Sequence, residues 1–582
     1  MQKHQTIMKP TSAKDDPNLS DYQNTRESFD WSDVEKELDW LPNGGLNLAY
    51  EAIDRHVAKG NGEKLAMIWE GKNGEKETYS YDQMRIETNK FANSLLNLGV
   101  KKGERVFTFM ERIPEIYFAV FGTLKMGGVI GPLFSAFGPD PVKDRLENSG
   151  ASVLVTQPEL LKKIESIFPS LPNLKHIIVV NKNGRSSEPV APNNLDYYKL
   201  MSDASEEFGP IATTRDDYSI MHYTSGTTGK PKGAVHRHNA VIQHYLTGKW
   251  CLDLHENDIY WCTADPGWVT GTSYGMSAPW TNGVTQVIYE GGFNARKWYQ
   301  ILQDYNVSVW YTAPTAIRML MKSGKELPQS FDLSNLRFSA SVGEPLNPEA
   351  VEWGVDAIGM PFHDNWWQTE TGAIMIANYA SAEIKPGSMG KPLPGIFPGI
   401  IDAEGNEKSD GEEGNLAVKT PWPSMFQDYW EQRERYDSRF VAGWYLTGDE
   451  AYRDSDGYYW FIGRSDDVIN TAGHLVGPFE VESALIEHPA VAEAGVIGKP
   501  DPIAMEVVKA FVSLKEGYEP STELQRELMG FARQKLAAAV APREIEIIDS
   551  LPKTRSGKIM RRLLKARELG LPEGDTSTLE ED

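Results

Sequence analysis

The sequence predicts an α/β protein with a large N-terminal domain of parallel sheets, a β-rich subdomain, and a small α+β domain at its C-terminus. Its 582 residues far exceed the ~250 to 300 at which a single core stops growing, so at least two domains are expected. Apolar strand-like runs alternate with amphipathic helical stretches, which implies right-handed crossovers and mainly parallel strands. After residue 384 the chain changes character, because glycine, proline and aromatic residues become frequent.

The alternating pattern predicts the elements of the large domain in order. In the first half we expect helix 81–98, strand 105–110, a helix from Pro114, strand 152–156, helix 159–167 and strand 176–180. After residue 218 the pattern resumes with strand 307–312, helix 315–321, strand 337–342 and helix 348–357. A strand followed by a helix and then another strand favours parallel pairing.

Two further segments follow. Between residues 384 and 460, runs such as Lys391–Gly399 favour short strands over helices. The polar run Gly463–Asp467 precedes a compact pattern of helix 479–487, strands 494–497 and 508–514, and helix 521–538. We therefore predict a flexible or surface-draped arm over 1–28, a large domain over 29–465, a small domain over 466–572 and an acidic tail over 573–582.

Composition narrows the class of protein. Lysine and arginine number 59 against 82 aspartate and glutamate residues, so the formal net charge is −23. A general binder of nucleic acid or anionic membrane needs the opposite balance, so neither partner is expected. Only Cys251 and Cys262 occur, and we expect buried thiols rather than a disulfide framework. Because the chain has no apolar signal segment and no uninterrupted apolar span, a cytoplasmic protein is expected.

One segment concentrates residues that suit phosphate. It reads Thr-Ser-Gly-Thr-Thr-Gly-Lys-Pro-Lys-Gly from Thr224 to Gly233. Glycines let backbone N–H groups turn toward a phosphate, hydroxyls donate hydrogen bonds, and lysines supply charge. The segment is not a Walker A loop, because Pro231 stands five positions after Gly226, where that motif has glycine. We favour a phosphate-binding loop over an ordinary surface turn, with Thr224, Ser225, Gly226, Thr227, Thr228, Gly229 and Lys230 as its residues.

Two other segments carry candidate chemistry. Phe362–Gly372 combines two indoles, a carboxylate and several amide or hydroxyl groups, which suits a pocket wall that stacks on a planar ring and holds a metal phosphate. Lys553–Arg567 holds seven cations in fifteen residues of a very acidic chain. Lys558 follows Ser556 and Gly557, where a turn could present it to a ligand, whereas a solvated basic helix is the simpler alternative.

Two motifs point less strongly to other chemistry. Gly271–Gly275 matches the G-x-S-x-G nucleophile elbow of serine hydrolases, with Ser273 as nucleophile. The residues before it do not form an apolar strand, so we favour a loop of small residues. His236, His238 and His244 lack a matching carboxylate or cysteine spacing, so packing is favoured over a metal site.

Five motifs occur in the order found in the adenylate-forming acyl-CoA synthetases: Tyr223–Gly233, Trp366–Gly372, Tyr445–Asp449, Gly463–Arg464 and Pro552–Lys558. The chain resembles this superfamily over residues 30 to 572. Within it, the sequence is most similar to the AMP-forming acetate–CoA ligases (acetyl-CoA synthetases) in their short bacterial form. The resemblance implies a large adenylate-forming (AMP-binding) domain, a hinge at Asp466 and a mobile C-terminal lid.

The resemblance also implies a two-step ligase reaction that uses ATP, Mg²⁺ and coenzyme A. Acetate would attack the α-phosphate of ATP to give acetyl-AMP and pyrophosphate, and coenzyme A would then displace AMP. A carboxylate is already ionised at neutral pH, so the first step depends on positioning and charge neutralisation. The implied catalytic residues are Lys558, bridging the carboxylate and the α-phosphate, Glu370 on Mg²⁺, and Thr369 near the α-phosphate.

Binding roles follow from the same resemblance. The Thr224–Gly229 loop would hold the β and γ phosphates, and Asp449 and Arg464 would grip the ribose hydroxyls. Arg533 would meet coenzyme A, and His488 corresponds to a residue at a second cation site. The adenine would be lined by Gly343, Glu344, Pro345, Asp364, Asn365, Trp366, Trp367 and Gln368. The acetate pocket would consist of Val269, Thr270, Val342 and Trp367, with Trp367 as the plug that excludes longer acids.

Two departures from the family pattern bear on turnover. Leu475 stands where an arginine commonly contacts phosphate, and Ala504-Met505 replaces the usual Arg-Gly before Glu506. They leave open a nucleotide-binding paralogue without turnover, and a propionate or medium-chain ligase is the closer alternative. An acyltransferase or deacylase acting on Lys558 is a further implied partner, because acylation would remove the cation that adenylation needs. The sequence is compatible with a monomer and with a homo-oligomer.

Overall fold

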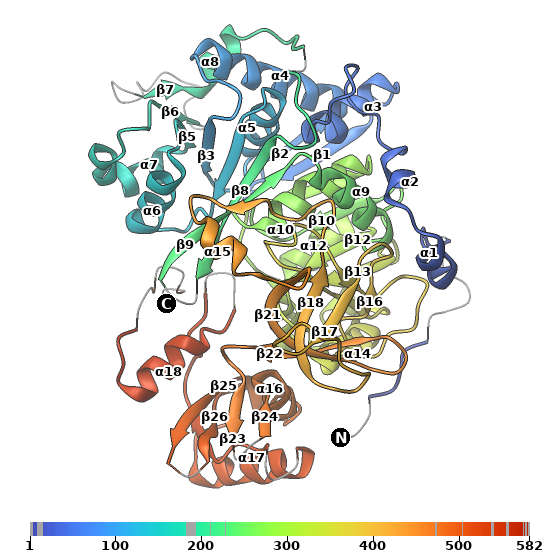
Figure 1. Cartoon of the computed structure of the whole chain (residues 1–582), viewed down its shortest axis with the longest axis vertical. Helices are drawn as coiled ribbons and strands as arrows, with labels where there is room; N and C mark the ends of the chain where they lie inside the picture. Colours follow the sequence, from blue (N-terminus) through green and yellow to red (C-terminus); the bar gives the residue numbers. More distant parts are fainter. Residues whose placement is uncertain are drawn as a thin grey trace.

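The computed structural model describes residues 4–8, 16–181, 194–209, 211–226, 229–471, 474–502, 504–536, 540–554, 558–573, 576 and 579. Figure 1 shows a large body with a smaller domain below it, formed by the C-terminal part of the chain. Two long sheets, mostly of parallel strands, fill the large body, and the small domain mixes helices with one further sheet. The predicted α/β fold with a small α+β C-terminal domain is therefore confirmed.

The first long sheet has nine strands in the order β16-β15-β14-β13-β12-β10-β11-β1-β2. Its central strands pair in parallel, and the outer strands β2, β15 and β16 pair antiparallel. The strands are β1 (Leu65–Glu70), β2 (Lys76–Ser80), β10 (Ile259–Cys262), β11 (Thr285–Tyr289), β12 (Val309–Thr312), β13 (Phe338–Ser341), β14 (Phe362–Trp366), β15 (Ile376–Ala377) and β16 (Lys391–Pro392). The helices between them are α9 (Ala240–Trp250), α12 (Ala295–Asp304), α13 (Pro314–Lys322) and α14 (Pro348–Ile358).

The second long sheet has eight strands in the order β19-β9-β8-β4-β3-β5-β6-β7. All pairs are parallel except β8 with β9 and β9 with β19. The strands are β3 (Arg105–Phe109), β4 (Val129–Leu133), β5 (Val153–Thr156), β6 (His176–Val179), β7 (Leu195–Asp196), β8 (Tyr218–Gly226), β9 (Gly229–Arg237) and β19 (Asp428–Tyr429). The helices are α4 (Tyr81–Asn97), α5 (Pro114–Lys125), α6 (Pro139–Ser149), α7 (Pro158–Ile164) and α8 (Tyr197–Asp203).

Local sequence explains several helix boundaries. Helix α4 begins with a capping box, in which Ser80 and Gln83 each accept a hydrogen bond from the other's backbone N–H. Helices α13 and α14 have proline in their first turn, and Gly359 ends α14 at φ +79°, a conformation that favours glycine. Sequence signals of this kind account for the agreement of the predicted helices with the observed ones.

The predicted N-terminal arm lies along the large domain where it is described. Leu19 is buried, and Asn18 bonds to Asp253 and Leu254. The helices that follow are α1 (Tyr22–Ser28), α2 (Trp31–Glu35) and α3 (Arg55–Ala58), with a π-helix at Tyr50–Asp54 before α3.

The predicted β-rich subdomain is confirmed as a five-stranded antiparallel sheet in the order β17-β18-β21-β20, with β22 also paired to β21. Its elements are β17 (Pro398–Ile401), β18 (Gly414–Lys419), α15 (Arg433–Asp437), β20 (Phe440–Val441), β21 (Trp444–Arg453) and β22 (Tyr459–Arg464). The small domain has a second five-stranded sheet, built from β23 (Ile469–Thr471), β24 (His474–Val476), β25 (Val491–Asp501), β26 (Met505–Leu514) and β27 (Glu544–Ile547). Its helices are α16 (Pro478–Ile486), α17 (Thr522–Lys535) and α18 (Arg561–Leu569).

The expectation of a loop around the G-x-S-x-G motif is wrong. Helix α10 (Val269–Thr272) runs into a π-helix at Ser273–Ser277 and then α11 (Ala278–Thr281). Ser273 is only 3% exposed, and its hydroxyl donates to the Gly372 carbonyl oxygen at 3.1 Å. No strand leads into Ser273, so this serine is a packing residue.

The three histidines near β9 are packing residues in the structure. His236 and His244 are buried, with ring nitrogens facing the carbonyl oxygens of Ser424 and Gly372. His238 is buried and accepts from the Leu48 amide at 3.0 Å. Both cysteines are free, with Cys251 buried and Cys262 half-buried. Among the described helices, none is both long and apolar enough to cross a membrane.

Candidate active site

A buried carboxylate joins three of the five motifs. Asp449 on β21 is 3% exposed and accepts hydrogen bonds from Trp366 Nε1 and Gln368 Nε2, both at 2.9 Å. Arg464 on β22 donates to its other oxygen at 2.8 Å. Burial raises the pKa of Asp449, and the Arg464 charge opposes that rise. The antiparallel pairing of β21 with β22, which sets Asp449 opposite Arg464, fixes this ionised pair at the domain boundary.

A second carboxylate lies among cations. Glu370 accepts a hydrogen bond from the Tyr429 hydroxyl at 2.7 Å, and the Lys232 ammonium lies 5.0 Å from the centre of the Tyr429 ring. Burial lowers the pKa of Lys232, Glu370 raises it, and the positive charges of Arg435 and Arg439 lower it further. These residues form a local concentration of positive charge around one carboxylate, which suits a polyphosphate with a hard metal ion.

The predicted phosphate loop is a β-hairpin. Strands β8 and β9 pair antiparallel up to Gly226 and Gly229, while Thr227 and Thr228 lie outside the described residues. The Thr224 hydroxyl oxygen is buried and has no hydrogen-bond partner among the described residues. A buried hydroxyl without a partner is unusual in a protein, and a bound phosphate oxygen would satisfy it.

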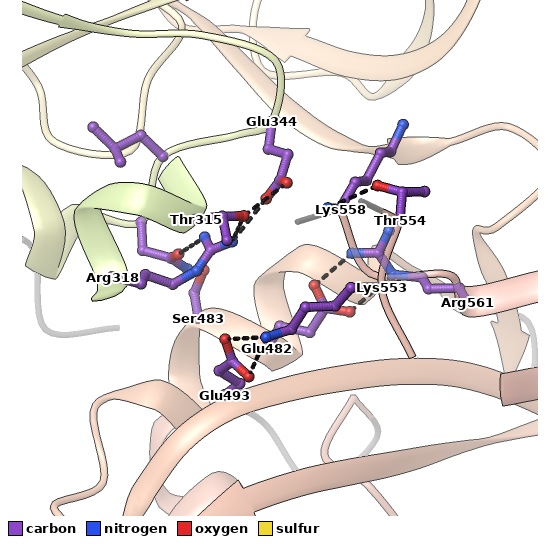
Figure 2. Close-up of polar contacts among 12 residues, drawn as sticks. Thr315, Arg318, Glu344, Glu482, Ser483, Glu493, Lys553, Thr554, Lys558 and Arg561 are labelled. Atoms are coloured by element: carbon purple, nitrogen blue, oxygen red, sulfur yellow. Dashed lines mark hydrogen bonds and ion pairs between the residues drawn. The ribbon is translucent and has the colours of Figure 1, made fainter. Parts of the chain in front are cut away.

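The loop after β13 is held from two sides. Asp364 on β14 accepts from the backbone N–H of Leu346 at 3.2 Å, and burial raises the pKa of its carboxyl to about 8. Arg318 on α13 donates to Glu344 at 2.7 Å, and Thr315 donates to the same carboxylate at 3.0 Å. Figure 2 shows Arg318 and Thr315 turned toward Glu344. The predicted adenine loop Gly343–Pro345 is therefore fixed by side chains of the large domain.

The other residues predicted to line the adenine and acetate pockets differ in how exposed they are. Asn365 and Trp366 are buried in β14, where Asn365 accepts from the Tyr311 hydroxyl at 2.9 Å. Trp367 is half-buried and packs edge-on against Tyr274, with ring centres 5.1 Å apart. Tyr274 belongs to the helical segment that begins at Val269 and Thr270. Val342, at the end of β13, is 6% exposed.

The small domain brings Lys558 to this region. Lys558 is exposed, and its backbone N–H bonds to the Thr554 hydroxyl at 3.1 Å. Lys558 lines a cavity between the domains together with Glu344 and Pro345, and its charge acts on the carboxyl of Asp449. Figure 2 shows Glu344 and Lys558 on the ribbons of the two domains. Two residues more than 200 positions apart in the sequence thus face one space.

Of the remaining predicted residues, Asp466 lies beside Arg464, whereas Arg533 and His488 lie elsewhere in the small domain. Asp466 is exposed, with Arg464 Nε 3.8 Å from its carboxylate. Arg533 is exposed on α17. His488 is buried in the small domain, where its Nε2 lies 3.3 Å from Glu527. The side chain of Leu475 lies outside the described residues.

Sequence reasoning missed several residues of the site. Tyr429 and Arg439 belong to no motif, and Arg318 lies in the middle of an ordinary amphipathic helix. Arg439 bonds to the Thr447 carbonyl oxygen and lies over the Tyr445 ring, 5.6 Å from its centre. Tyr429 and Arg318 bond to Glu370 and Glu344, which are distant from them in sequence, so no local pattern could have found these two residues.

Comparison with known proteins agrees with this geometry. A family model described as AMP-binding enzyme matches residues 54–430, and one described as AMP-binding enzyme C-terminal domain matches residues 480–558. Acetyl-coenzyme A synthetase of Bacillus subtilis (strain 168) is 52% identical over 569 residues, covering 97% of this chain and 98% of the relative. Acetyl-coenzyme A synthetase of Methanothrix thermoacetophila is 41% identical, covering 93% and 86%.

Two solved structures of CoA ligases are also similar to this chain over most of its length. The anthranilate CoA ligase AuaEII in complex with anthranoyl-AMP has a TM-score of 0.84 at 32% identity and covers 93% of this chain and 99% of its own. An acyl-CoA synthetase of Brucella canis has a TM-score of 0.74 at 33% identity, covering 95% and 99%. The chain belongs to the family of AMP-binding enzymes, as the order of its motifs indicates.

Proposed function

We propose that this chain is an AMP-forming acetate–CoA ligase. Acetate and ATP give acetyl-AMP and pyrophosphate, and coenzyme A then gives acetyl-CoA and AMP. The observation that carries the proposal is the interdomain cavity that Glu344, Pro345 and Lys558 line together, with the Lys558 charge acting on the carboxyl of Asp449. The high identity to acetyl-coenzyme A synthetases over nearly the whole chain supports it.

In the first step, a carboxylate oxygen of acetate attacks the α-phosphorus of ATP. The new O–P bond forms while the bond to the bridging oxygen between the α and β phosphates breaks, and pyrophosphate leaves with the electron pair. The nucleophile is already an anion, so no residue has to remove a proton. The protein must instead hold two anions together and neutralise their charge, and we assign this to Lys558 and the Thr224–Lys230 hairpin.

The nucleotide itself is assigned to the walls of the large domain. Asp449 and Arg464 are suited to the ribose hydroxyls, because a carboxylate accepts two hydroxyl donors at once. The adenine is assigned to the Gly343–Pro345 loop and the Asp364–Gln368 segment. Within that segment, Asp364 acts through the loop backbone, since its side chain is buried.

Mg²⁺ fits the Glu370 carboxylate, with Thr369 beside it. Hard oxygen donors next to a phosphate site are what this ion prefers, and when bound it neutralises phosphate charge. The second predicted cation site, at His488, has less support. Its Nδ1 accepts from the Ala490 amide, and imidazole nitrogen suits softer metals than Mg²⁺.

In the second step, the thiolate of coenzyme A attacks the acetyl carbonyl carbon, the C–S bond forms, and AMP leaves as the C–O bond breaks. We propose that the small domain, residues 466–572, turns about Asp466 and brings Arg533 to coenzyme A. The exposure of both residues is compatible with these roles. Leu475 and Met505 would leave this state with fewer polar contacts than the family pattern provides.

The choice of acetate rests on the aromatic wall formed by Trp367 and Tyr274. A pocket distinguishes acids that differ by one methylene by only ~1 to 3 kcal/mol unless its volume is filled, and a bulky indole fills it. A propionate or medium-chain ligase is the alternative within the same chemistry.

We also propose that the cell can silence the enzyme by acylating Lys558. Its exposure would admit a modifying acyltransferase and a deacylase, and an amide in place of the ammonium removes the charge that the first step uses.

The function is tested by turnover with ATP, coenzyme A and acids from acetate to octanoate, with AMP as the measured product. We expect AMP release that requires both acid and coenzyme A and is fastest with acetate. A maximum at propionate or a longer acid would favour the alternative ligase. Tight nucleotide binding without AMP release would instead identify a paralogue that has lost turnover.

A further inference from the structure

Helix α13 of the large domain presents two cations to the small domain. Arg318 and Lys322 are four residues apart and therefore lie on one face of the helix. Lys322 Nζ lies 3.8 Å from Glu493 on β25, and Arg318 bonds to Asn347, which itself bonds to the small domain. Neither cation belongs to a motif that the proposed function uses.

The first contact runs from the small domain to the adenine loop. Asn347, just before α14, donates to the Ser483 hydroxyl of α16 at 2.7 Å. Arg318 Nη1 donates to the side-chain oxygen Oδ1 of Asn347 at 3.4 Å, and its Nη2 donates to Glu344 at 2.7 Å. Figure 2 shows Arg318 between Glu344 and Ser483. One guanidinium thus connects the loop assigned to adenine with the residue that receives the small domain.

The second contact runs to the segment that carries Lys558. Glu493 accepts from Lys553 with both carboxylate oxygens at 2.7 Å, and Lys322 Nζ lies 3.8 Å from one of these oxygens, Oε1. Lys553 pairs with Ile559 in an isolated β-bridge, and the Thr554 amide bonds to the Lys558 carbonyl oxygen at 2.8 Å. Glu493 therefore links Lys322 of α13 to Lys553, which pairs with the residue after Lys558.

From these contacts we infer that one surface of the large domain, the α13 dock, holds the small domain in the orientation needed for adenylation. The α13 dock consists of Arg318 and Lys322 on one face of α13 together with the neighbouring Asn347. Arg318, Lys322 and Asn347 are positioning residues, acting through Ser483 and Lys553 on the place of Lys558. The inference rests on the proposed function, in which the small domain must leave this orientation before coenzyme A reacts. One neutral hydrogen bond and one half-exposed ion pair suit a contact that must break in every cycle, since each is weak in net terms.

The test separates the two half-reactions of the full-length enzyme. The variants are Ser483→Ala, Lys322→Ala and their combination, with Lys322→Arg as the conservative rescue. Lys325→Ala is the matched control, because Lys325 lies just after α13 but pairs with Asp356 inside the large domain at 2.6 Å. Adenylation is measured as acetate-dependent exchange of pyrophosphate into ATP. The second step is measured as acetyl-CoA formed from supplied acetyl-AMP and coenzyme A.

We expect each single variant to slow the exchange about threefold and the double variant about tenfold, as expected when a two-state equilibrium shifts against one state. The second step should be unchanged or faster, and Lys322→Arg and Lys325→Ala should match the wild type. An equal loss in both half-reactions, or no loss of exchange in the double variant, would overturn the inference. If the wild type itself shows no acetate-dependent exchange, the proposed function fails instead.

Discussion

Two parts of the candidate site differ in how firmly their side chains are held. One is the wall of the large domain that is assigned to the nucleotide, and the other is the segment of the small domain that carries Lys558. Asp449 is buried, and three side chains from two segments donate to it. Lys558 is exposed, and among the described contacts only its backbone is hydrogen-bonded, to Thr554. One side of the site is rigid before any ligand arrives, while the other is carried on the edge of a separate domain.

The difference assigns different tasks to the two sides. In the proposed reaction, fixed and mutually bonded groups would bind a nucleotide that stays in place through both steps, because preorganised groups need no reorganisation during the reaction. A lightly held cation can be withdrawn once the charge that it neutralises has left as pyrophosphate. Variants of the wall around Asp449 should therefore affect both half-reactions. Variants of Lys558, on the small domain, should affect only one.

The largest effect is expected for Lys558→Ala. Acetate-dependent pyrophosphate exchange should fall by about a thousandfold, as when a preorganised charge-stabilising donor is removed. Acetyl-CoA formation from supplied acetyl-AMP should stay within a few-fold of wild type. Lys565→Ala, which removes a cation of α18 that pairs with Glu506, is the control and should leave the exchange near wild type. Retained exchange in Lys558→Ala would remove this residue from the first step.

Asp449→Asn should weaken nucleotide binding about 10- to 100-fold, because the charge-assisted bond to Arg464 is lost and only Asp466, at 3.8 Å, remains as a carboxylate beside that guanidinium. Unlike the Lys558 variant, it should impair both half-reactions. Titration calorimetry with AMP measures the affinity. Asp456→Asn is the control, since this exposed carboxylate pairs with Lys385 far from the cluster. A loss confined to one half-reaction would contradict the assignment of Asp449 to a fixed wall.

Acid should act on the large domain through its buried histidines. Burial lowers the pKa of His56 and His222 to about 3, and of His236, His238 and His244 to about 4. The unfolded chain, with histidine pKa values near 6.5, takes up protons first as the pH falls, so stability is lost between pH 6.5 and about 4. At pH 5 each histidine should lower the free energy of unfolding by at most about 2 kcal/mol.

Denaturant melts from pH 7.5 to 5 measure this loss, with tryptophan fluorescence reporting on the large domain. Replacing His244 with glutamine should flatten the pH dependence by one titrating group. A melt that does not change over this range would mean that these rings are protonated inside the folded protein.

The contrast between the two sides also marks what the sequence could predict. Helices such as α4 and α14 follow from caps, prolines and apolar spacing, which are local. Asp449 and Lys558 are predicted as site residues because they belong to family motifs. The α13 dock was not predicted, because Lys322 meets Glu493 only where the two domains meet, and Arg318 reaches the small domain only through Asn347.

Local patterns also misled at Gly271. This glycine and its small neighbours predicted a loop, yet the residues are helical. A side chain at this position would collide with the Asp265 carbonyl oxygen, so the glycine serves close packing rather than a turn. Sequence alone does not distinguish these two uses of glycine.

Trp367→Gly should change the choice of acid. Removing the indole from its place against Tyr274 opens room for a longer chain, and the ratio of kcat/KM for butyrate to that for acetate should rise about tenfold or more. AMP release with a series of acids measures the profile. Trp460→Gly, in the β-rich subdomain, is the control. A profile that stays centred on acetate would show that other groups set the volume.

The smallest effect is expected in the small domain, at Met505. This residue closes the hairpin between β25 and β26 at φ +67°, where side chains are disfavoured, and it is 66% exposed. The family pattern has glycine here, and the backbone of this chain has kept the conformation that glycine allows. Met505→Gly should therefore stabilise the small domain, by about 0.5 to 1 kcal/mol after the greater freedom of the unfolded glycine is subtracted.

Hydrogen exchange of the β25 and β26 amides measures this local gain, and the pyrophosphate exchange rate should not change. Met505→Ala separates two explanations, because alanine removes the exposed thioether but keeps the strained backbone. The Met505→Ala variant should therefore show no gain in protection of these amides. If alanine stabilises the hairpin as much as glycine does, the exposed side chain and not the left-handed backbone is what weakens this edge of the small domain.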